Sequence, residues 1–267
     1  MKDERIISPQ NERLKSWVKL QKDGTARRER GELVLEGRRL VDTALGTGLV
    51  KTFIYSDKFA KGDPLVDRAH ARGLECLMLS MVAFRKLAHV PSPQGVACVA
   101  RLPTCDPASL FAGNAFLMVA CGVQEPGNLG TMVRSAAAAG ATGLVALAPS
   151  ADLYHPRAVR GSAGAVLALG TARMTEDDFV SRLDEADLNL LCALARDGFD
   201  YRSADYARPL AIAVGSEAHG IPQSVLERGT NVTIPMPGGT ESLNAATAAA
   251  LLAFEALRSR GDGTPSG

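Results

Sequence analysis

The stretch AFLMVACGVQEPGNLGTMVRSAAAAGA, residues 115–141, decides the fold of the larger part of this chain. Its first nine residues form an apolar run that is typical of a strand buried on both faces of a parallel sheet. A short polar and glycine-containing segment ends that strand, and the helix that follows stops at a glycine. A buried strand, a turn and a helix in this order predict one βα unit of an α/β domain.

The same alternation continues on both sides of this unit. After it, we expect strands at 143–149, 188–195, 209–217 and 231–236, and helices at 155–169, 222–229 and 242–260. Before a proline-containing linker at 101–114, we expect helices at 8–21 and 64–73, strands at 50–57, 74–80 and 95–102, and a strand followed by a helix within 31–48. The sequence therefore predicts two α/β domains, at 1–105 and 112–260, and a disordered tail at 261–267.

Composition narrows the class of protein. With 46% hydrophobic and 22% charged residues among 267, the chain can bury a globular core. The start of the chain is charged and has no apolar segment of the kind found in secretory signals, and the longest apolar stretch, 245–257, is too short to span a bilayer. Five cysteines without a CxxC pair argue against disulfides and a zinc site. We expect a cytoplasmic protein without metal or membrane association.

The distribution of charge is uneven although the net charge is only +1. Residues 1–110 hold 19 Lys and Arg residues against 13 Asp and Glu residues, so the first domain is basic and the second acidic. A basic domain supplies salt-sensitive attraction to nucleic-acid phosphates. The alternative is that any chain divided in two shows some asymmetry. The candidates for RNA capture are Lys15, Lys19, Arg27, Arg28, Arg38 and Arg39.

Three strand ends in the second domain carry unusual residues, and the carboxyl ends of parallel strands share one edge of a sheet. At the first, Asn128 can cap the following helix, and Arg134 can reach back and bind a phosphate with its planar fork. The alternative is a capped helix with a solvent-facing arginine. At the second, GSEAHGIP (215–222) is bracketed by glycines but is neither GxGxxG nor a P-loop, so a tight turn is the alternative.

The third strand end, PGGTESLN (237–244), precedes a long alanine-rich helix. Either Ser242 or Asn244 could cap that helix. The absence of charge from 245 to 254 predicts that the helix is buried on nearly all sides.

Together the segments at 125–145, 213–222 and 234–255 resemble the SpoU, or TrmH-like, family of RNA 2′-O-ribose methyltransferases within the SPOUT class. Residues 153–165 resemble the intermediate stretch of the family, and 33–45 resemble its small α/β substrate-binding domain. The resemblance implies an α/β fold with a SPOUT-type parallel sheet and a deep trefoil knot in the C-terminal domain. It also implies a homodimer with the site at the subunit interface.

The resemblance further implies that S-adenosylmethionine donates a methyl group to a ribose 2′-hydroxyl of RNA. The residues implied for catalysis are Asn128, Arg134, Glu217, Ser242 and Asn244. The residues implied for cofactor binding are Leu194, Ala195, Gly215, Ser216, Ile234, Met236, Ser242 and Leu243. Because arginine stays protonated, we expect Arg134 to bind the adjacent phosphate and to position the hydroxyl.

The separate N-terminal domain favours ribosomal RNA as the substrate, by analogy with the family. The alternatives are a tRNA ribose methyltransferase, a non-catalytic RNA-binding relative and a small-molecule nucleotide enzyme. Because both common mononucleotide fingerprints are absent, the last alternative is disfavoured.

Overall fold

The computed structural model describes residues 4–59 and 62–261, which divide into two compact units. Unit 1 contains Met1–Pro103 and Tyr154–Ala168, and unit 2 contains Thr104–Leu153 and Leu169–Gly267. The chain therefore leaves unit 2 after Leu153, adds a short segment to unit 1 and returns at Leu169. From position 262 onward, the predicted tail lies outside the described residues.

Unit 2 is built on a seven-stranded sheet in the order β10-β12-β9-β11-β6-β7-β8, and every neighbouring pair runs parallel. The strands are β6 (Phe116–Cys121), β7 (Gly143–Leu147), β8 (Gly170–Met174), β9 (Asn189–Leu194), β10 (Phe199–Asp200), β11 (Leu210–Gly215) and β12 (Thr230–Thr233). The helices are α6 (Pro107–Leu110), α7 (Pro126–Ala138), α9 (Glu176–Ala186), α10 (Gln223–Leu226) and α11 (Ala245–Ser259), with a 3-10 turn at Tyr201–Ser203.

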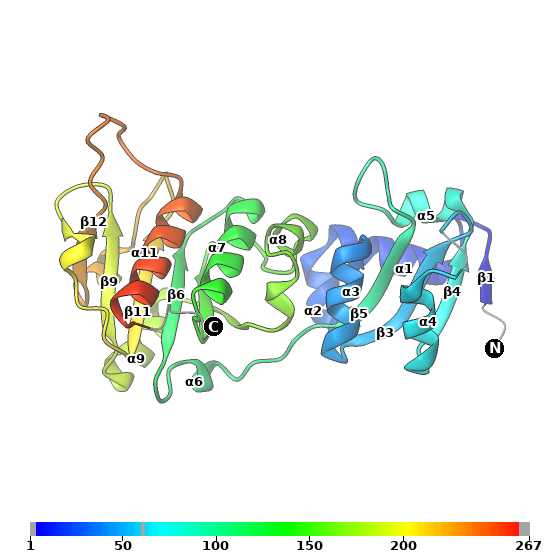
Figure 1. Ribbon diagram of the computed structural model, residues 1–267, viewed down its shortest axis with the longest axis horizontal. Coiled ribbons are helices and arrows are strands. Elements are labelled where there is room, and N and C mark those ends of the chain that lie inside the picture. Colours follow the sequence, from blue (N-terminus) through cyan, green and yellow to red (C-terminus); the bar gives the residue numbers. More distant parts are fainter. Residues whose placement is uncertain (1–3, 60–61, 262–267) are drawn as a thin grey trace. The chain divides into compact units, whose positions relative to one another are not determined.

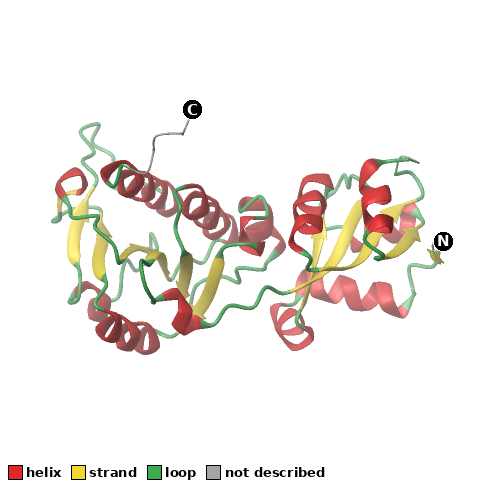
Figure 2. Cartoon of the chain, turned by 60° about the horizontal axis from the view of Figure 1, so that its bottom comes forward, coloured by secondary structure: helices red, strands yellow, loops and turns green. Residues whose placement is uncertain are grey.

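Helices cover both faces of this sheet (Figures 1 and 2). On one face, Leu117 and Val119 of β6 belong to the same buried cluster as Phe179 and Leu183 of α9. On the other face, α7 packs against β6 and β7, and α11 packs against α7 and β11. Because both faces are covered, the central strands β6, β7, β9 and β11 are apolar on both sides, which is why they are continuous apolar runs in the sequence.

Unit 1 contains a five-stranded mixed sheet in the order β1-β4-β3-β5-β2, in which β5 runs antiparallel to β2 and β3. The strands are β1 (Glu4–Ile6), β2 (Glu32–Glu36), β3 (Val50–Ser56), β4 (Glu75–Leu79) and β5 (Val96–Arg101). The helices are α1 (Glu12–Lys22), α2 (Gly24–Arg30), α3 (Arg38–Thr47), α4 (Pro64–Ala71), α5 (Met81–Leu87) and α8 (Pro156–Gly161), with a 3-10 turn at Ala165–Leu167. One core cluster joins Trp17 of α1 and Phe84 of α5 to the sheet.

The single helix predicted at 155–169 is wrong in its length. α8 ends at Gly161, and the chain then turns through Ala163 and Gly164, whose φ angles are 51° and 90°. Both angles lie in the left-handed region, which a helix cannot use. A strand, β8, and a polar helix, α9, follow at 170–186, where no element was predicted.

The prediction that the last helix is buried on nearly all sides is also wrong for the single chain. Ala249, Leu252 and Ala253 of α11 are buried, but Leu251 and Phe254 are 41% and 47% exposed. These two side chains are three positions apart and therefore share one face of the helix. Among the residues that the structure describes, an apolar face of α11 is therefore left uncovered.

The C-terminal part of the chain moves outward in the sheet and then returns. β12 follows β11 in the sequence but lies on the far side of β9, and α11 then packs back against β11 and α7. The trefoil knot expected in this part of the chain stays a prediction.

Candidate active site

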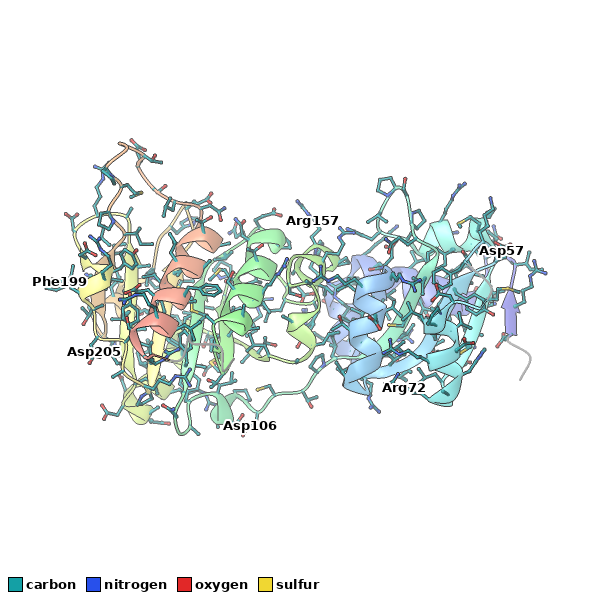
Figure 3. The ribbon with its side chains drawn as sticks, in the orientation of Figure 1. Asp57, Arg72, Asp106, Arg157, Phe199 and Asp205 are labelled. Carbon is teal, nitrogen blue, oxygen red and sulfur yellow. The ribbon has the colours of Figure 1, made fainter. Side chains whose placement is uncertain are left out.

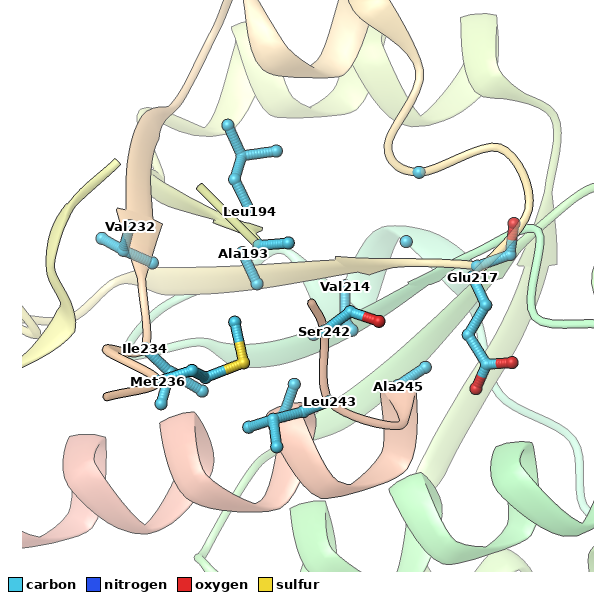
Figure 4. A pocket seen from close by; sticks show the side chains of 15 residues that line it. Ala193, Leu194, Val214, Glu217, Val232, Ile234, Met236, Ser242, Leu243 and Ala245 are labelled. Atoms are coloured by element: carbon cyan, nitrogen blue, oxygen red, sulfur yellow. The ribbon is translucent and has the colours of Figure 1, made fainter. Parts of the chain in front are cut away.

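The carboxyl ends of β9, β11 and β12 surround a cavity of about 220 Å³ in unit 2 (Figure 4). Figure 4 shows Glu217 at one end of the cavity and Ile234 and Met236 at the other. The structure places all eight residues predicted to bind the cofactor in its lining: Leu194, Ala195, Gly215, Ser216, Ile234, Met236, Ser242 and Leu243. Apolar walls with a few polar groups at one end suit a flat aromatic ligand that carries a charged tail.

Gly215 closes one wall of this cavity by backbone packing. A Cβ atom there would collide with the carbonyl group of Gly220 and would lie 2.6 Å from the backbone nitrogen of Ile221. The loop between them is tight, because the backbone nitrogen of Gly220 donates to the carbonyl oxygen of Ser216 at 2.9 Å. Position 215 therefore requires glycine to hold the loop against the end of β11.

Three of the predicted catalytic residues meet beside the cavity. Asn244 Nδ2 lies 3.2 Å from Asn128 Oδ1 and 3.3 Å from Glu217 Oε1, and donates to both. The other end of the same amide, Oδ1, accepts from the backbone nitrogens of Ala246 and Thr247 and so caps α11. Capping and site assembly, which were alternatives in the sequence, are both functions of this side chain.

Asn128 does not cap α7, which corrects the sequence-based interpretation. The cap is Glu125, whose Oε1 accepts from the backbone nitrogen of Gly127 at 3.3 Å, and Pro126 occupies the first helical position. A proline there lacks only a backbone N–H that has no partner inside a helix. Asn128 lies within the first turn of α7, where its side chain can bond to Asn244.

The remaining two predicted catalytic residues lie differently. Ser242 lines the cofactor-sized cavity. Arg134 is exposed on α7, and no hydrogen bond or ion pair joins its side chain to another residue within 4–59 and 62–261. The single chain therefore brings Asn128, Glu217 and Asn244 together and leaves Arg134 pointing outward from its helix.

A second cavity of about 210 Å³ adjoins the first and shares Ser216, Glu217 and Ala245 with it. Asn128 also lines it. Sequence reasoning missed Gln124, Glu125 and His219 as lining residues, although they belong to the first two predicted loops. The signal was their position in those loops, because none of the three residue types identifies a site by itself.

The candidates for RNA capture differ in accessibility. Arg27 is 2% exposed and donates to the carbonyl oxygen of Leu20, so it is structural, contrary to our expectation. Lys15 pairs with Glu12, and Arg38 pairs with Asp63. Lys19, Arg28 and Arg39 are exposed.

Four of the five cysteines are buried, and Cys105 is half-buried. All five are free, and burial raises the pKa of Cys98, Cys121 and Cys192 well above the ordinary value. Within the described residues, no group of three His, Cys, Asp or Glu side chains is placed to hold a metal ion. The same part of the chain contains no helix with the length and apolar character needed to cross a bilayer.

Comparisons with known proteins give a family match in each of the two units. Residues 115–254 match the SpoU rRNA Methylase family, and 11–98 match the MRM3-like substrate binding domain. The 23S rRNA (guanosine(2553)-2′-O)-methyltransferase RlmP of Bacillus subtilis is 30% identical over 93% of this chain and 97% of its own length. A solved structure of an RNA 2′-O ribose methyltransferase is 33% identical, with a TM-score of 0.80, over 96% of this chain and 99% of the other.

A second solved structure was determined with its cofactor. It is the AdoMet-bound rRNA methyltransferase from Sinorhizobium meliloti, which is 27% identical with a TM-score of 0.85. The alignment covers 96% of this chain and 98% of that one. The likeness therefore extends over both units.

Proposed function

The chain belongs to the SpoU rRNA Methylase family, and we propose that it transfers a methyl group from S-adenosylmethionine to a ribose 2′-hydroxyl of ribosomal RNA. The observation that carries this proposal is the bonding of Asn244 to Asn128 and Glu217 at the junction of two cavities. One cavity suits the cofactor, and the other suits the ribose that accepts the methyl group.

The residues around the first cavity fit S-adenosylmethionine. The side chains of Leu194, Ile234 and Leu243 offer apolar surface to an adenine ring, and the bare backbone at Gly215 allows close approach. When bound, this group supplies an electrophilic methyl group attached to a sulfonium. Glu217 lines both cavities and would lie between the bound cofactor and the ribose.

The protein's part in the reaction is alignment, because methyl transfer is a direct displacement. Asn244 holds Asn128 and Glu217 in place, and these two side chains orient the ribose in the second cavity. Glu217 accepts a hydrogen bond from the 2′-hydroxyl, which increases the nucleophilicity of its oxygen. Arg134 binds the neighbouring phosphate and so positions the hydroxyl. Glu217 takes up the hydroxyl proton as the new C–O bond replaces the bond from the methyl carbon to sulfur.

We propose that Arg134 reaches the site from a second copy of the chain. Within one chain, Arg134 is exposed on α7, and α7 packs against α11, whose Leu251 and Phe254 form an uncovered apolar face. A second copy related by a two-fold axis would cover that face and bring its own α7 to the first chain's site. The active protein is accordingly a homodimer.

Subunit complementation tests this arrangement. Arg134→Ala and Glu217→Gln, each inactive alone, should recover partial activity when the two variants are mixed and refolded together. The recovery arises because the mixed dimer contains one site with both native residues. If the mixture stays inactive while copurification of two differently tagged variants confirms mixed dimers, Arg134 and Glu217 belong to the same chain's site.

Ribosomal RNA is the proposed substrate because residues 11–98 match the MRM3-like substrate binding domain and because RlmP, by its name, acts on 23S rRNA. The free cysteines agree with a reducing compartment, and we propose the cytoplasm. Transfer of tritiated methyl from S-adenosylmethionine to purified rRNA and, separately, to tRNA tests the function. Label in rRNA as 2′-O-methylnucleoside is expected. Label confined to tRNA favours the tRNA alternative, and RNA binding without label favours a non-catalytic relative.

A further inference from the structure

The segment Tyr154–Ala168 belongs to unit 1 although it interrupts unit 2 between β7 and β8. Its turn is packed closely: a Cβ atom on Gly164 would lie 3.0 Å from Thr43 Cγ2 and 3.5 Å from Leu40 Cδ2 of α3. Ser162, which is buried, holds the turn by donating to the carbonyl oxygen of Val159 and accepting from the backbone nitrogen of Gly164. The segment is thus well packed and forms an integral part of unit 1.

The short helix in this segment, α8, has two different faces. Pro156, Ala158 and Val159 are buried, and the helix packs against β2. Arg157 and Arg160 are exposed, and Figure 3 shows the Arg157 side chain extending from α8 toward solvent. The segment contains no acidic residue.

The surroundings of α8 are electropositive. His89 of unit 1 contacts His155 edge to face, with ring centroids 5.9 Å apart. Partial burial, followed by the positive charges of Arg160, His155, Arg157 and Arg27, lowers the pKa of His89. The acidic neighbour is Glu36, which accepts from the backbone nitrogen of His89 at 2.6 Å and lines a small cavity together with Arg160. The hydrogen bond leaves the charge of this carboxylate in place, so Glu36 offsets part of the positive charge around α8.

We propose that Arg157 and Arg160 of α8 bind backbone phosphates of the RNA substrate, which makes α8 a second RNA-binding element of unit 1. Guanidinium groups match phosphate oxygens in geometry and remain charged. The closely packed turn fixes the position of the helix that carries them. Leu153 and Leu169, which flank this segment, belong to unit 2. The chain therefore connects α8 directly to the catalytic sheet at both ends. The proposal rests on the proposed function, since RNA is the phosphate-bearing partner.

The test is salt-dependent binding of a fluorescein-labelled RNA hairpin to the full chain, measured by anisotropy. Each phosphate contact contributes about −0.7 to −0.9 to the slope of log affinity against log salt concentration. Loss of both contacts in Arg157→Ala/Arg160→Ala should therefore reduce the slope by about 1.5 and raise Kd about tenfold at moderate salt. Arg157→Lys/Arg160→Lys keeps the charge and should retain most of the slope.

The matched control is Arg72→Ala/Arg85→Ala, which removes two exposed arginines from other parts of unit 1. Thermal unfolding and calorimetric binding of S-adenosylmethionine should be unchanged in all three variants. An unchanged slope in the α8 alanine variant, or an equal loss in the control, overturns the proposal. Binding requires no methyl transfer, so RNA capture through α8 by a protein that transfers nothing contradicts only the proposed function.

Discussion

Asn244 Nδ2 donates to Asn128 Oδ1 across 3.2 Å, and so joins two residues 116 positions apart in the chain. The same side chain caps α11 through Oδ1, so its two ends have separable roles. The N-terminus of α11 and the first turn of α7 are held together by this amide.

The two roles of Asn244 predict different results for two substitutions. Asn244→Ser keeps a capping oxygen but loses the Nδ2 donor, so the free energy of unfolding should stay near the native value while kcat falls at least about tenfold. Asn244→Ala should lose both activity and about 1 kcal/mol of stability. Chemical denaturation and single-turnover kinetics measure the two effects. Full activity in the serine variant would show that the bond to Asn128 has no part in catalysis.

Gly215 predicts a steric effect on cofactor binding. The contacts that a Cβ atom would make with Gly220 and Ile221 mean that even alanine at this position must displace the loop. Gly215→Ala should therefore weaken S-adenosylmethionine binding at least about tenfold and also lower the Tm. Gly238→Ala is the control, because nothing lies within 4 Å of a Cβ atom there. Calorimetry that gives equal affinities for the two variants would exclude this role.

Arg134 predicts a loss of turnover without a loss of cofactor affinity. If its guanidinium binds the phosphate and helps remove the hydroxyl proton, Arg134→Ala should lower the single-turnover rate by about 10²–10⁴-fold. Arg134→Lys keeps the charge but loses the planar fork, and should also be impaired. Arg173→Ala, an exposed arginine on β8, serves as the control. Near-native rates in both Arg134 variants would mean that Arg134 has no part in the removal of the proton and would leave this role to Glu217.

The centre of the parallel sheet was predictable because β6, β7, β9 and β11 are largely buried on both faces and therefore appear as uninterrupted apolar runs. β8 and α9 were missed for the opposite reason: β8 is only partly buried, and α9 is mostly polar, with Phe179 and Leu183 as its buried residues. A signal was present in Thr175, which caps α9 ahead of three acidic residues. Short polar elements of this kind have too few apolar positions to show a period.

The candidate site was predictable in its loops but not in its assembly. Each loop alone was compatible with a plain turn, and only the spatial meeting of Asn128, Glu217 and Asn244 distinguishes a site from three turns. The packing of Tyr154–Ala168 into unit 1 was not predictable, because its contacts with Leu40 and Thr43 span more than 100 positions. Long-range pairings of this kind leave no local pattern.

Glu36 predicts how the stability of unit 1 depends on pH. Burial raises the pKa of its carboxyl above 4.5, its ordinary value, although the backbone nitrogen of His89 and the charge of Arg160 act in the opposite direction. Its Oε1 has no hydrogen-bond partner among the described residues. Because the folded state holds this proton more tightly than the unfolded state, stability should fall as pH rises from 4.5 through the raised pKa and then level off.

Glu36→Gln removes that loss, because a neutral amide keeps an acceptor for the backbone of His89 and has no charge to desolvate. The variant should be more stable than the native protein at pH 8, and the difference should shrink as the pH approaches 4.5. Glu29→Gln makes the same change in charge at an exposed position of unit 1 and provides the comparison. Urea denaturation across this pH range measures the effect. A Glu36→Gln variant that is less stable at pH 8 would mean that attraction to Arg160 outweighs desolvation.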